Sequence, residues 1–352
     1  MTTAALPTLS EDDLNHMFYG LSTYDWSYFK GKRLFVTGGS GFIGKWLLSA
    51  LIEADHRLSL GCRIEILTRS PLIFSRAIPQ IACAKNVKLH EGDVRNFKFP
   101  EGNFDIVVHA ATDIALQRSP SDIFTTCVDG TRRALEFSKV SHATDFLLTS
   151  SGAVYGKHPS EHNVVDESYL GGPDHTRPES AYGEGKRVSE WLACTHASET
   201  GLRVKIARIY AQVGPYLPLD KHFAIGNFIN DAMSDREILI RGDGTPLRSY
   251  LHAADTAIWL WAMVVRGEPN RAWNVGSDNG ISIAQLAQRV GQLLDSTKGV
   301  RVLMESDPGK TVERYVPNIH RAMHELKPPT PISLDDSIFR TASWIRKNRV
   351  IS

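Results

Sequence analysis

The sequence is poor in cysteine and has neither a long apolar run nor a block of like charge, and each absence excludes a class of protein. Its 352 residues include four scattered cysteines without metal-ligand pairing: Cys62, Cys83, Cys127 and Cys194. We therefore expect reduced thiols, a cytoplasmic location and no metal site. No apolar stretch approaches the roughly 20 residues of a membrane span. A net charge of +1 without a long basic run argues against nucleic acid as a partner.

A glycine-rich loop near the start of the chain is the first positive signal. The segment Thr37-Gly-Gly-Ser-Gly-Phe-Ile-Gly44 follows a short apolar run, Arg33–Thr37, and precedes apolar residues at helical spacing. A glycine-rich match alone is usually a turn, but the order strand, loop, helix favours binding of a dinucleotide pyrophosphate. The residues that we assign to the cofactor here are Gly38, Gly41, Phe42, Ile43 and Gly44.

Strand and helix patterns alternate from about residue 32 to residue 210, which predicts an α/β fold with a doubly wound parallel Rossmann sheet. The predicted strands are Arg33–Thr37, Arg63–Thr68, Val87–Glu91, Ile106–Ala110, Asp145–Ser150 and Val204–Tyr210. Helical patterns lie between them, for example Asp129–Val140 and Ala181–Glu199. We expect an N-terminal extension over residues 1–30, with a helix capped by Ser10, and a dinucleotide-binding domain over 31–210 with a later strand near 272–276. Residues 211–350, where proline, glycine and aromatic residues punctuate shorter elements, predict a smaller substrate-binding lobe.

The segment Tyr182-Gly-Glu-Gly-Lys186 places a phenol and an ammonium one helical turn apart. A nearby ammonium favours the phenolate, so we expect the pKa of Tyr182 to be lowered and Tyr182 to exchange a proton with a hydroxyl group while hydride leaves the same carbon. Ser151 follows a predicted strand and would bond the same oxygen. The same spacing at Tyr28 and Lys32 precedes the glycine loop, so position in the chain, and not spacing, selects Tyr182.

With these motifs in place, the chain resembles the extended short-chain dehydrogenase/reductase family, particularly its nucleotide-sugar epimerase, dehydratase and decarboxylase branch. The likeness runs from about Lys32 to the C-terminus. The segments that carry it are Thr37–Gly44, Gly92-Asp-Val94, His109-Ala-Ala111, Leu147–Gly156, Tyr182–Lys186, Gly242–Asp255 and Asn274-Val-Gly276.

The resemblance implies roles for individual residues. It implies that Asp93 and Val94 contact adenine, that Ala110 and Ala111 pass beside the cofactor, and that Lys186 holds the nicotinamide ribose. It places Ser151 and Tyr182 at the reacting carbon and Arg248 on the diphosphate of a nucleoside-diphosphate sugar. Arg314 resembles a second phosphate-binding arginine, with a solvated charge as the alternative, and we also assign Asn227 to the substrate. A homodimer formed through a four-helix contact is implied as well.

Departures from the family pattern reduce the number of reactions expected of this chain. Dehydratases of this family carry an Asp-Glu pair after the catalytic hydroxyl, and related decarboxylases keep the glutamate, whereas this chain has Gly152 and Ala153. Neither residue can carry a proton, so dehydration and decarboxylation are disfavoured. A substrate-contacting asparagine of the family is replaced by Ala211, and Cys127 stands where another asparagine is common.

The end of the second predicted strand bears on the choice of cofactor. An acidic residue there binds the adenosine ribose of NAD, but this chain has Thr68 followed by Arg69, which could accept a 2′-phosphate. The alternative is that Arg69 stacks on adenine or faces solvent. We expect NAD(P), with NADP(H) favoured.

The combined expectation is an NAD(P)-dependent nucleotide-sugar epimerase that works through a transient 4-keto intermediate. The first alternative is an NADPH-dependent 4-ketoreductase, in which Tyr182 donates the proton. The second is a regulator of the same fold that binds cofactor without turnover. A complete set of Ser151, Tyr182 and Lys186 argues against the regulator.

Overall fold

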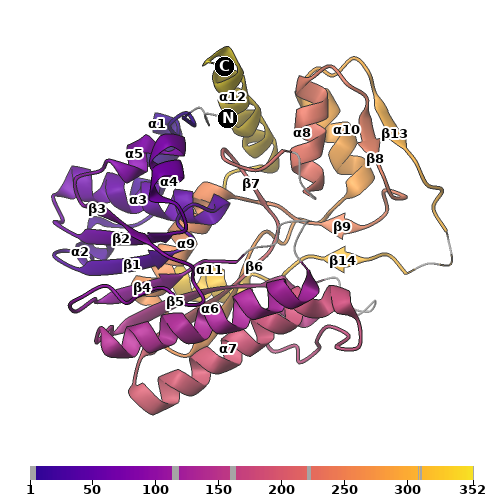
Figure 1. The fold of residues 1–352 in the computed structure, drawn as a ribbon. Coiled ribbons are helices and arrows are strands. Elements are labelled where there is room, and N and C mark those ends of the chain that lie inside the picture. The colour runs from indigo at the N-terminus through magenta and orange to yellow at the C-terminus, as the bar shows by residue number, and fades with distance from the viewer. Residues whose placement is uncertain are drawn as a thin grey trace.

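The computed structural model describes residues 5–112, 119–158, 164–219, 223–307, 309 and 311–351. A seven-stranded sheet runs through its centre in the order β11-β6-β5-β4-β1-β2-β3, with every neighbouring pair parallel (Figure 1). Its strands are β1 (Arg33–Thr37), β2 (Arg63–Thr68), β3 (Val87–Glu91), β4 (Ile106–His109), β5 (Asp145–Ser151), β6 (Arg203–Ile209) and β11 (Arg271–Val275). The predicted doubly wound parallel sheet is confirmed.

Two helical layers cover the sheet because successive residues of each strand point to opposite faces. On β1, Leu34 and Val36 belong to the larger core, whereas Phe35 belongs to a separate core on the other face. Helices α3 (Phe42–Leu58) and α9 (Ala253–Arg266) bury residues in the first core, and α6 (Pro120–Val140) and α7 (Ala181–Thr200) bury residues in the second. Figure 1 shows α6 and α7 side by side along one face.

The start of one helix differs from the predicted one, and one later strand joins the sheet as predicted. Helix α6 begins at Pro120, where the pattern predicted helix only from residue 129, because the Ser119 side chain caps it and proline occupies its first turn. The sheet has one strand more than the six predicted before residue 211, because β11 pairs with β6. The segment expected to return to the sheet near 272–276 is this strand.

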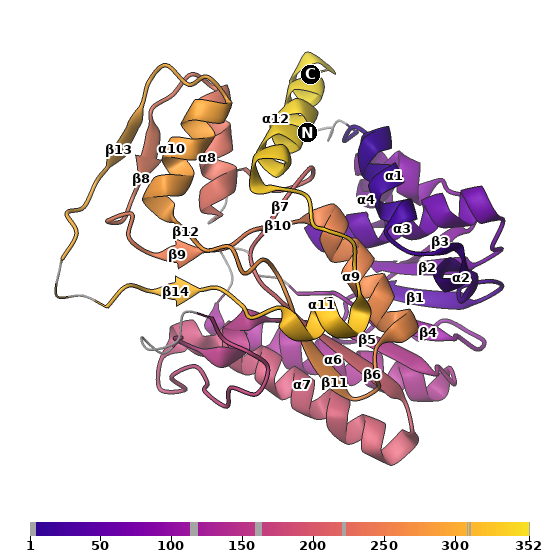
Figure 2. The ribbon, with the colours of Figure 1, turned by 180° about the vertical axis from the view of Figure 1, so that it is seen from behind.

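A second group of elements faces the carboxyl ends of the strands (Figure 2). Its centre is the three-stranded sheet β12-β9-β14, and β8 pairs with β13 beside it. The elements are α8 (Ala224–Met233), β8 (Ile238–Ile240), β9 (Leu247–Arg248), β12 (Ile281–Ser282), α10 (Ile283–Leu293), β13 (Val300–Val302) and β14 (Arg314–Tyr315). The remaining elements are α4 (Pro71–Ala77), α5 (Pro79–Ala82), β7 (Gln212–Val213), β10 (Leu251–His252), α11 (His320–Leu326), α12 (Leu334–Ile351) and two 3₁₀ turns at Gly152–Tyr155 and Pro178–Ser180.

The N-terminal segment packs closely on the rest of the molecule. Helix α1 (Glu11–Tyr19) begins at the predicted cap, Ser10, and α2 (Thr23–Ser27) carries the fully buried Trp26. The Asp25 carboxylate accepts hydrogen bonds from the Arg266 guanidinium at the end of α9. Among the described residues, no helix combines the length and apolarity needed to cross a membrane.

Candidate active site

The glycine loop forms a tight backbone cradle at the start of α3. Gly38 has a φ of 76°, and a Cβ atom there would lie 2.4 Å from the carbonyl carbon and oxygen of Ala110. A Cβ atom at Gly44 would lie 2.2 Å from the Gly38 carbonyl oxygen. Gly41 caps the helix with no side chain of its own, so the helix amides and the positive end of the helix dipole can receive an anion. The pyrophosphate of a dinucleotide fits this cradle.

A cavity of about 750 Å³ joins this cradle to the predicted catalytic residues. It is lined by Gly38, Gly41, Phe42, Ile43 and Gly44 of the loop, by Ala110 and Thr112 after β4, by Ser151 at the end of β5, by Tyr182 and Lys186 of α7, and by Arg248 and Tyr315 of the opposing lobe. Residues distant in the chain thus meet at the carboxyl ends of β1, β4 and β5, where open parallel sheets bind their ligands.

The Ser151 hydroxyl is the meeting point of two phenols. It accepts a hydrogen bond from the Ala153 amide at 3.1 Å, and it lies near enough to the Tyr182 hydroxyl to oppose the rise in the pKa of that phenol. On its other side lies the Tyr315 hydroxyl, 3.3 Å away. Ser151 and Tyr182 therefore lie in one cavity, with the Tyr315 hydroxyl beside Ser151.

The Lys186 ammonium is buried and is held at the end of the sheet by two hydrogen bonds. Its Nζ atom donates to Thr112 Oγ1 at 2.6 Å and to the Thr149 carbonyl at 2.7 Å. The same atom lies 5.9 Å from the centre of the Tyr182 ring. Tyr182 and Lys186 therefore share a helix face, but the ammonium is directed mainly at the ends of β4 and β5.

The expected lowering of the Tyr182 pKa is wrong for this structure. Burial of the phenol raises its pKa above the ordinary value of 10, and the nearby Ser151 hydroxyl only partly opposes that effect. Burial also lowers the pKa of Lys186. The spacing of the two residues could not reveal that burial dominates the pKa of Tyr182, because burial depends on the surrounding fold.

The residues assigned to the adenosine half of the cofactor lie around the ends of β2 and β3. Thr68 ends β2, with Arg69 exposed directly after it. The Asp93 carboxylate is held by the guanidinium of Arg95, with contacts of 2.8 Å to both oxygens. These residues and Val94 are not among the described residues that line the cavity. Ala111 follows Ala110 at the cavity edge and donates its amide to Thr37 Oγ1 at 3.3 Å.

The residues assigned to the substrate lie apart from one another in the opposing lobe. Arg248 lines the main cavity and also a second one of about 660 Å³, and its guanidinium pairs with Glu313. Asn227 lines the second cavity only. Arg314 is not among the described residues that line either cavity, because its neighbour Tyr315 occupies the cavity side of β14.

Tyr315 was therefore missed, although it stands beside a predicted residue. The pattern drew attention to the charged Arg314, and only the pairing of β14 with β9 shows which of the two side chains faces Ser151. Thr112 was missed as well, and no signal in the sequence distinguishes it from other threonines.

Gly152 has a packing role that the sequence did not reveal. A Cβ atom at this position would lie 2.6 Å from the ring of Tyr210, and the rings of Tyr210 and Tyr315 pack together with centres 4.5 Å apart and their planes tilted by 36°. The space that a side chain at residue 152 would need is therefore filled by an aromatic ring. Within the described ranges, no group of three or more histidine, cysteine or acidic residues could hold a metal ion.

Comparison with known proteins agrees with this geometry. The profile of the NAD dependent epimerase/dehydratase family matches residues 34–276. UDP-glucuronic acid decarboxylase 1 from Arabidopsis thaliana is 27% identical over 328 residues, covering 92% of this chain and 72% of that protein. dTDP-D-glucose 4,6-dehydratase from Mus musculus is 26% identical over 331 residues, covering 90% and 89%.

Among solved structures, UDP-glucose 4-epimerase from Thermotoga maritima with UDP-glucose aligns with a TM-score of 0.75 at 21% identity, covering 90% of this chain and 99% of that one. UDP-N-acetylglucosamine 4-epimerase from Methanobrevibacter ruminantium aligns with a TM-score of 0.74 at 20% identity, covering 91% and 99%. These structures share the fold. Because the family profile spans well over half of the chain, the protein belongs to the NAD-dependent epimerase/dehydratase family, within the extended short-chain dehydrogenases/reductases.

Proposed function

We propose that the protein is an NAD(P)-dependent nucleotide-sugar epimerase that works through a transient 4-keto sugar. One observation carries the proposal: Ser151, Tyr182 and Lys186 meet the glycine cradle in a single cavity, and the two residues after Ser151 bear no carboxylate. Such a site has the groups for oxidising and reducing one sugar carbon. At the two positions after Ser151 it lacks a carboxylic acid that could transfer a proton in dehydration or decarboxylation.

Each catalytic side chain has one task in this scheme. A dinucleotide held by Gly38, Gly41 and Gly44 would supply reversible hydride transfer at the sugar carbon. In its phenolate form Tyr182 would take the proton of the hydroxyl group and, as the phenol, give it back, while Ser151 would bond the same oxygen. Lys186, held by Thr112 and Thr149, presents its ammonium to the ribose.

The named relatives include a decarboxylase and a dehydratase, and the residues beside Ser151 favour neither reaction for this protein. The ring of Tyr210 fills the space beside Gly152, so a carboxylate at residue 152 would need a different wall. Ala153 cannot supply the glutamate that both reaction types use in the resembling enzymes.

The substrate would span both cavities. Arg248, Ala224 and Ile283 line each of them, so the two spaces meet at a guanidinium suited to a diphosphate. We assign the sugar to the side of Tyr182 and the nucleoside to the side of Asn227. Cofactor binding then belongs to residues 31–210 with β11, and substrate binding mostly to residues 211–350.

A 4-ketoreductase is the second candidate, and two observations favour it. The raised pKa of Tyr182 keeps the phenol protonated, as a proton donor to a keto group requires. Arg69 after β2 suits the 2′-phosphate of NADPH.

A regulator that binds cofactor without turnover would not need Ser151, Tyr182 and Lys186 together. We further propose that the protein is a homodimer. We also propose a cytoplasmic location, because all four cysteines are free thiols.

The substitution Tyr182→Phe tests the enzymatic proposal. With UDP- and dTDP-hexoses as substrates, we expect kcat to fall at least about a hundredfold, because the proton acceptor is lost. Binding of NAD⁺ and NADP⁺, followed by tryptophan fluorescence, should change little. Conversion without net cofactor consumption supports the epimerase, whereas stoichiometric NADPH consumption with a 4-keto-sugar nucleotide supports the reductase. A variant as active as the wild type would remove Tyr182 from the mechanism.

A further inference from the structure

A buried carboxylate, that of Glu190, lies on α7 one turn beyond Lys186. The hydroxyl of Ser150 donates to its Oε1 atom at 2.5 Å. The Arg208 guanidinium on β6 donates to both carboxylate oxygens, with its shortest contact 2.7 Å from Nη2 to Oε2. Both oxygens are therefore engaged, and the serine that binds one of them directly precedes Ser151.

Two side chains of α7 hold the last residues of β5 immediately before Ser151. Lys186 donates to the Thr149 carbonyl, and Glu190 accepts from Ser150. The Lys186 contact lies one helical turn after Tyr182 and the Glu190 contact lies two turns after it. The separation of the Ser151 and Tyr182 hydroxyl groups is consequently set by where α7 meets β5.

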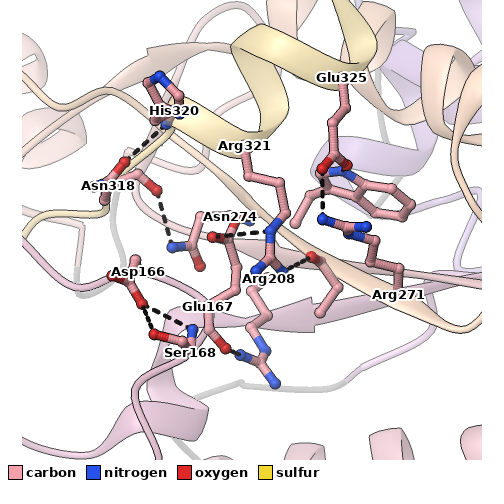
Figure 3. A network of polar contacts seen from close by, with 12 residues as sticks. Asp166, Glu167, Ser168, Arg208, Arg271, Asn274, Asn318, His320, Arg321 and Glu325 are labelled. Atoms are coloured by element: carbon pink, nitrogen blue, oxygen red, sulfur yellow. Dashed lines mark hydrogen bonds and ion pairs between the residues drawn. The ribbon is translucent and has the colours of Figure 1, made fainter.

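The network continues from Arg208 toward the strand that carries Tyr315. Arg208 Nη1 donates to the Tyr155 hydroxyl at 2.8 Å, which donates to Asn274 Oδ1 at 2.8 Å. The Asn274 amide donates to the carbonyl of Asn318 at 3.0 Å, three residues after Tyr315 (Figure 3). Groups on both sides of the Ser151 hydroxyl are thus tied to one buried set of polar contacts.

We propose that Glu190 is a positioning residue for proton transfer: through Ser150 it fixes Ser151 opposite Tyr182, and its negative charge acts on the buried ammonium of Lys186. Arg208 balances that charge, so the carboxylate stays buried as part of an ion pair. The inference rests on the proposed function and adds a residue that touches neither substrate nor cofactor.

The electrostatic part of the proposal follows from the groups around Lys186. They are Cys127 on α6, His109 on β4, and Tyr182 and Glu190 on α7. Burial lowers the pKa of His109 to about 3 and raises the pKa values of Cys127 and Tyr182, so all three are neutral near pH 7. Glu190 is the carboxylate of this set, and it raises the Lys186 pKa against the lowering by burial.

The substitution Glu190→Gln keeps the shape of the side chain and removes its charge. We expect kcat to fall about tenfold to a hundredfold, with little change in KM, because a small displacement of Ser151 misplaces the reacting oxygen. The Lys186 ammonium should also lose its proton at a lower pH, so the alkaline limb of the pH–rate profile should move to lower pH. Ser150→Ala removes the hydrogen bond but keeps the charge, and should lower kcat without moving that limb.

Glu199→Gln provides the matched control, because Glu199 is exposed near the end of the same helix. It should leave both kcat and the pH profile unchanged. Circular dichroism and thermal melting of each variant separate loss of folding from loss of positioning, and Ser150→Ala leaves the Glu190–Arg208 ion pair in place if Glu190→Gln does not fold.

Binding of NAD⁺ and NADP⁺ as a function of pH gives a readout that requires no sugar. The pH at which affinity weakens should be lower in Glu190→Gln than in the wild type. If the wild type turns over no nucleotide sugar, the proposed function fails, and this binding measurement alone decides the role of Glu190. A folded Glu190→Gln protein with wild-type kcat and an unshifted alkaline limb in both measurements would overturn the inference.

Discussion

At the scale of single residues, the site depends on the missing side chain of Gly152 and on the effect of burial on the pKa of Tyr182. Gly152 leaves room for the Tyr210 ring, which itself packs on Tyr315 beside Ser151. Burial raises the pKa of Tyr182, so the phenol is protonated near neutral pH. Shape and proton affinity at this site therefore follow from neighbours that are distant in the chain.

The first residue-scale prediction concerns Gly152→Ala. The added methyl group would lie 2.6 Å from the Tyr210 ring, so we expect a loss of about 1–3 kcal/mol in the free energy of unfolding. Tyr210→Leu should relieve part of that loss, so that the double variant is less destabilised than the sum of the two single variants. Chemical denaturation measures both effects.

Gly291→Ala on α10 is the control, because its new methyl group would meet its nearest neighbour at an ordinary 3.5 Å. It should be neutral or slightly stabilising. Strict additivity of the Gly152 and Tyr210 substitutions would contradict the packing argument.

Arg69→Ala tests the choice of cofactor. If the guanidinium binds a 2′-phosphate, NADPH should bind about tenfold or more weakly, because a charge-assisted hydrogen bond is lost, and NADH should be nearly unaffected. Titration of tryptophan fluorescence with each cofactor measures the difference. Equal effects on both would refute the preference for NADP(H).

Much of the site could be predicted from local sequence, and the remainder could not, for a physical reason. The glycine loop and the pair Tyr182 and Lys186 are each encoded within a few residues, so their spacing identifies them. Tyr315 meets Ser151 across 164 residues, and only strand pairing brings them together. The contact between Glu190 and Ser150 depends in the same way on how α7 lies against β5.

At the scale of elements, apolar strands are easier to locate than helix starts. β1, β2 and β3 begin and end as predicted: β1 and β2 are buried along most of their length, and β3 ends directly before Gly92. The start of α6 was placed nine residues late, because its first turns carry few apolar residues and are defined by the Ser119 cap. Caps identify helix ends better than periodicity does here.

The short helix α2 yields an element-scale prediction about pH. Burial of Asp25 opposes ionisation, but hydrogen bonds from Arg266 and Ser22 outweigh it and lower its pKa to about 2. Because this value is below that of the unfolded chain, near ~3.9, the carboxylate stabilises the fold above that pH and loses its effect as pH falls toward 2.

Asp25→Asn should therefore cost about 2 kcal/mol near pH 7, since hydrogen bonds to a charged group are lost. The difference from the wild type should shrink between about pH 4 and pH 2. Urea denaturation at a series of pH values measures it. A constant difference down to pH 2 would show that Asp25 acts through shape alone.

At the scale of the whole molecule, the N-terminal segment lies outside the family profile but packs against elements inside it and against the C-terminal helix α12. The profile begins at residue 34, yet Trp26 and Phe29 are fully buried in the larger core. The Pro7 carbonyl accepts hydrogen bonds from the hydroxyl of Tyr216, a wall of the main cavity, and from the indole of Trp344 on α12.

The proposed homodimer is testable at this scale. Trp191 on α7 is 64% exposed and Phe124 on α6 is 38% exposed, both on the two adjacent helices of one layer. Trp191→Glu should convert a dimer into a monomer, because a charge would be buried without a partner. Size-exclusion chromatography with light scattering measures the mass. Tyr24→Glu, at a residue 83% exposed on α2, should leave the mass unchanged, and a monomeric wild type would end the dimer proposal.

The hydrogen bond between Tyr216 and the Pro7 carbonyl suggests a way to follow ligand binding by fluorescence. A fluorophore attached beside Pro7 would lie next to Tyr216, which lines the main cavity, so its emission should respond when a ligand fills that cavity. The same dye on Tyr24 would stand in open solvent and serve as the silent reference.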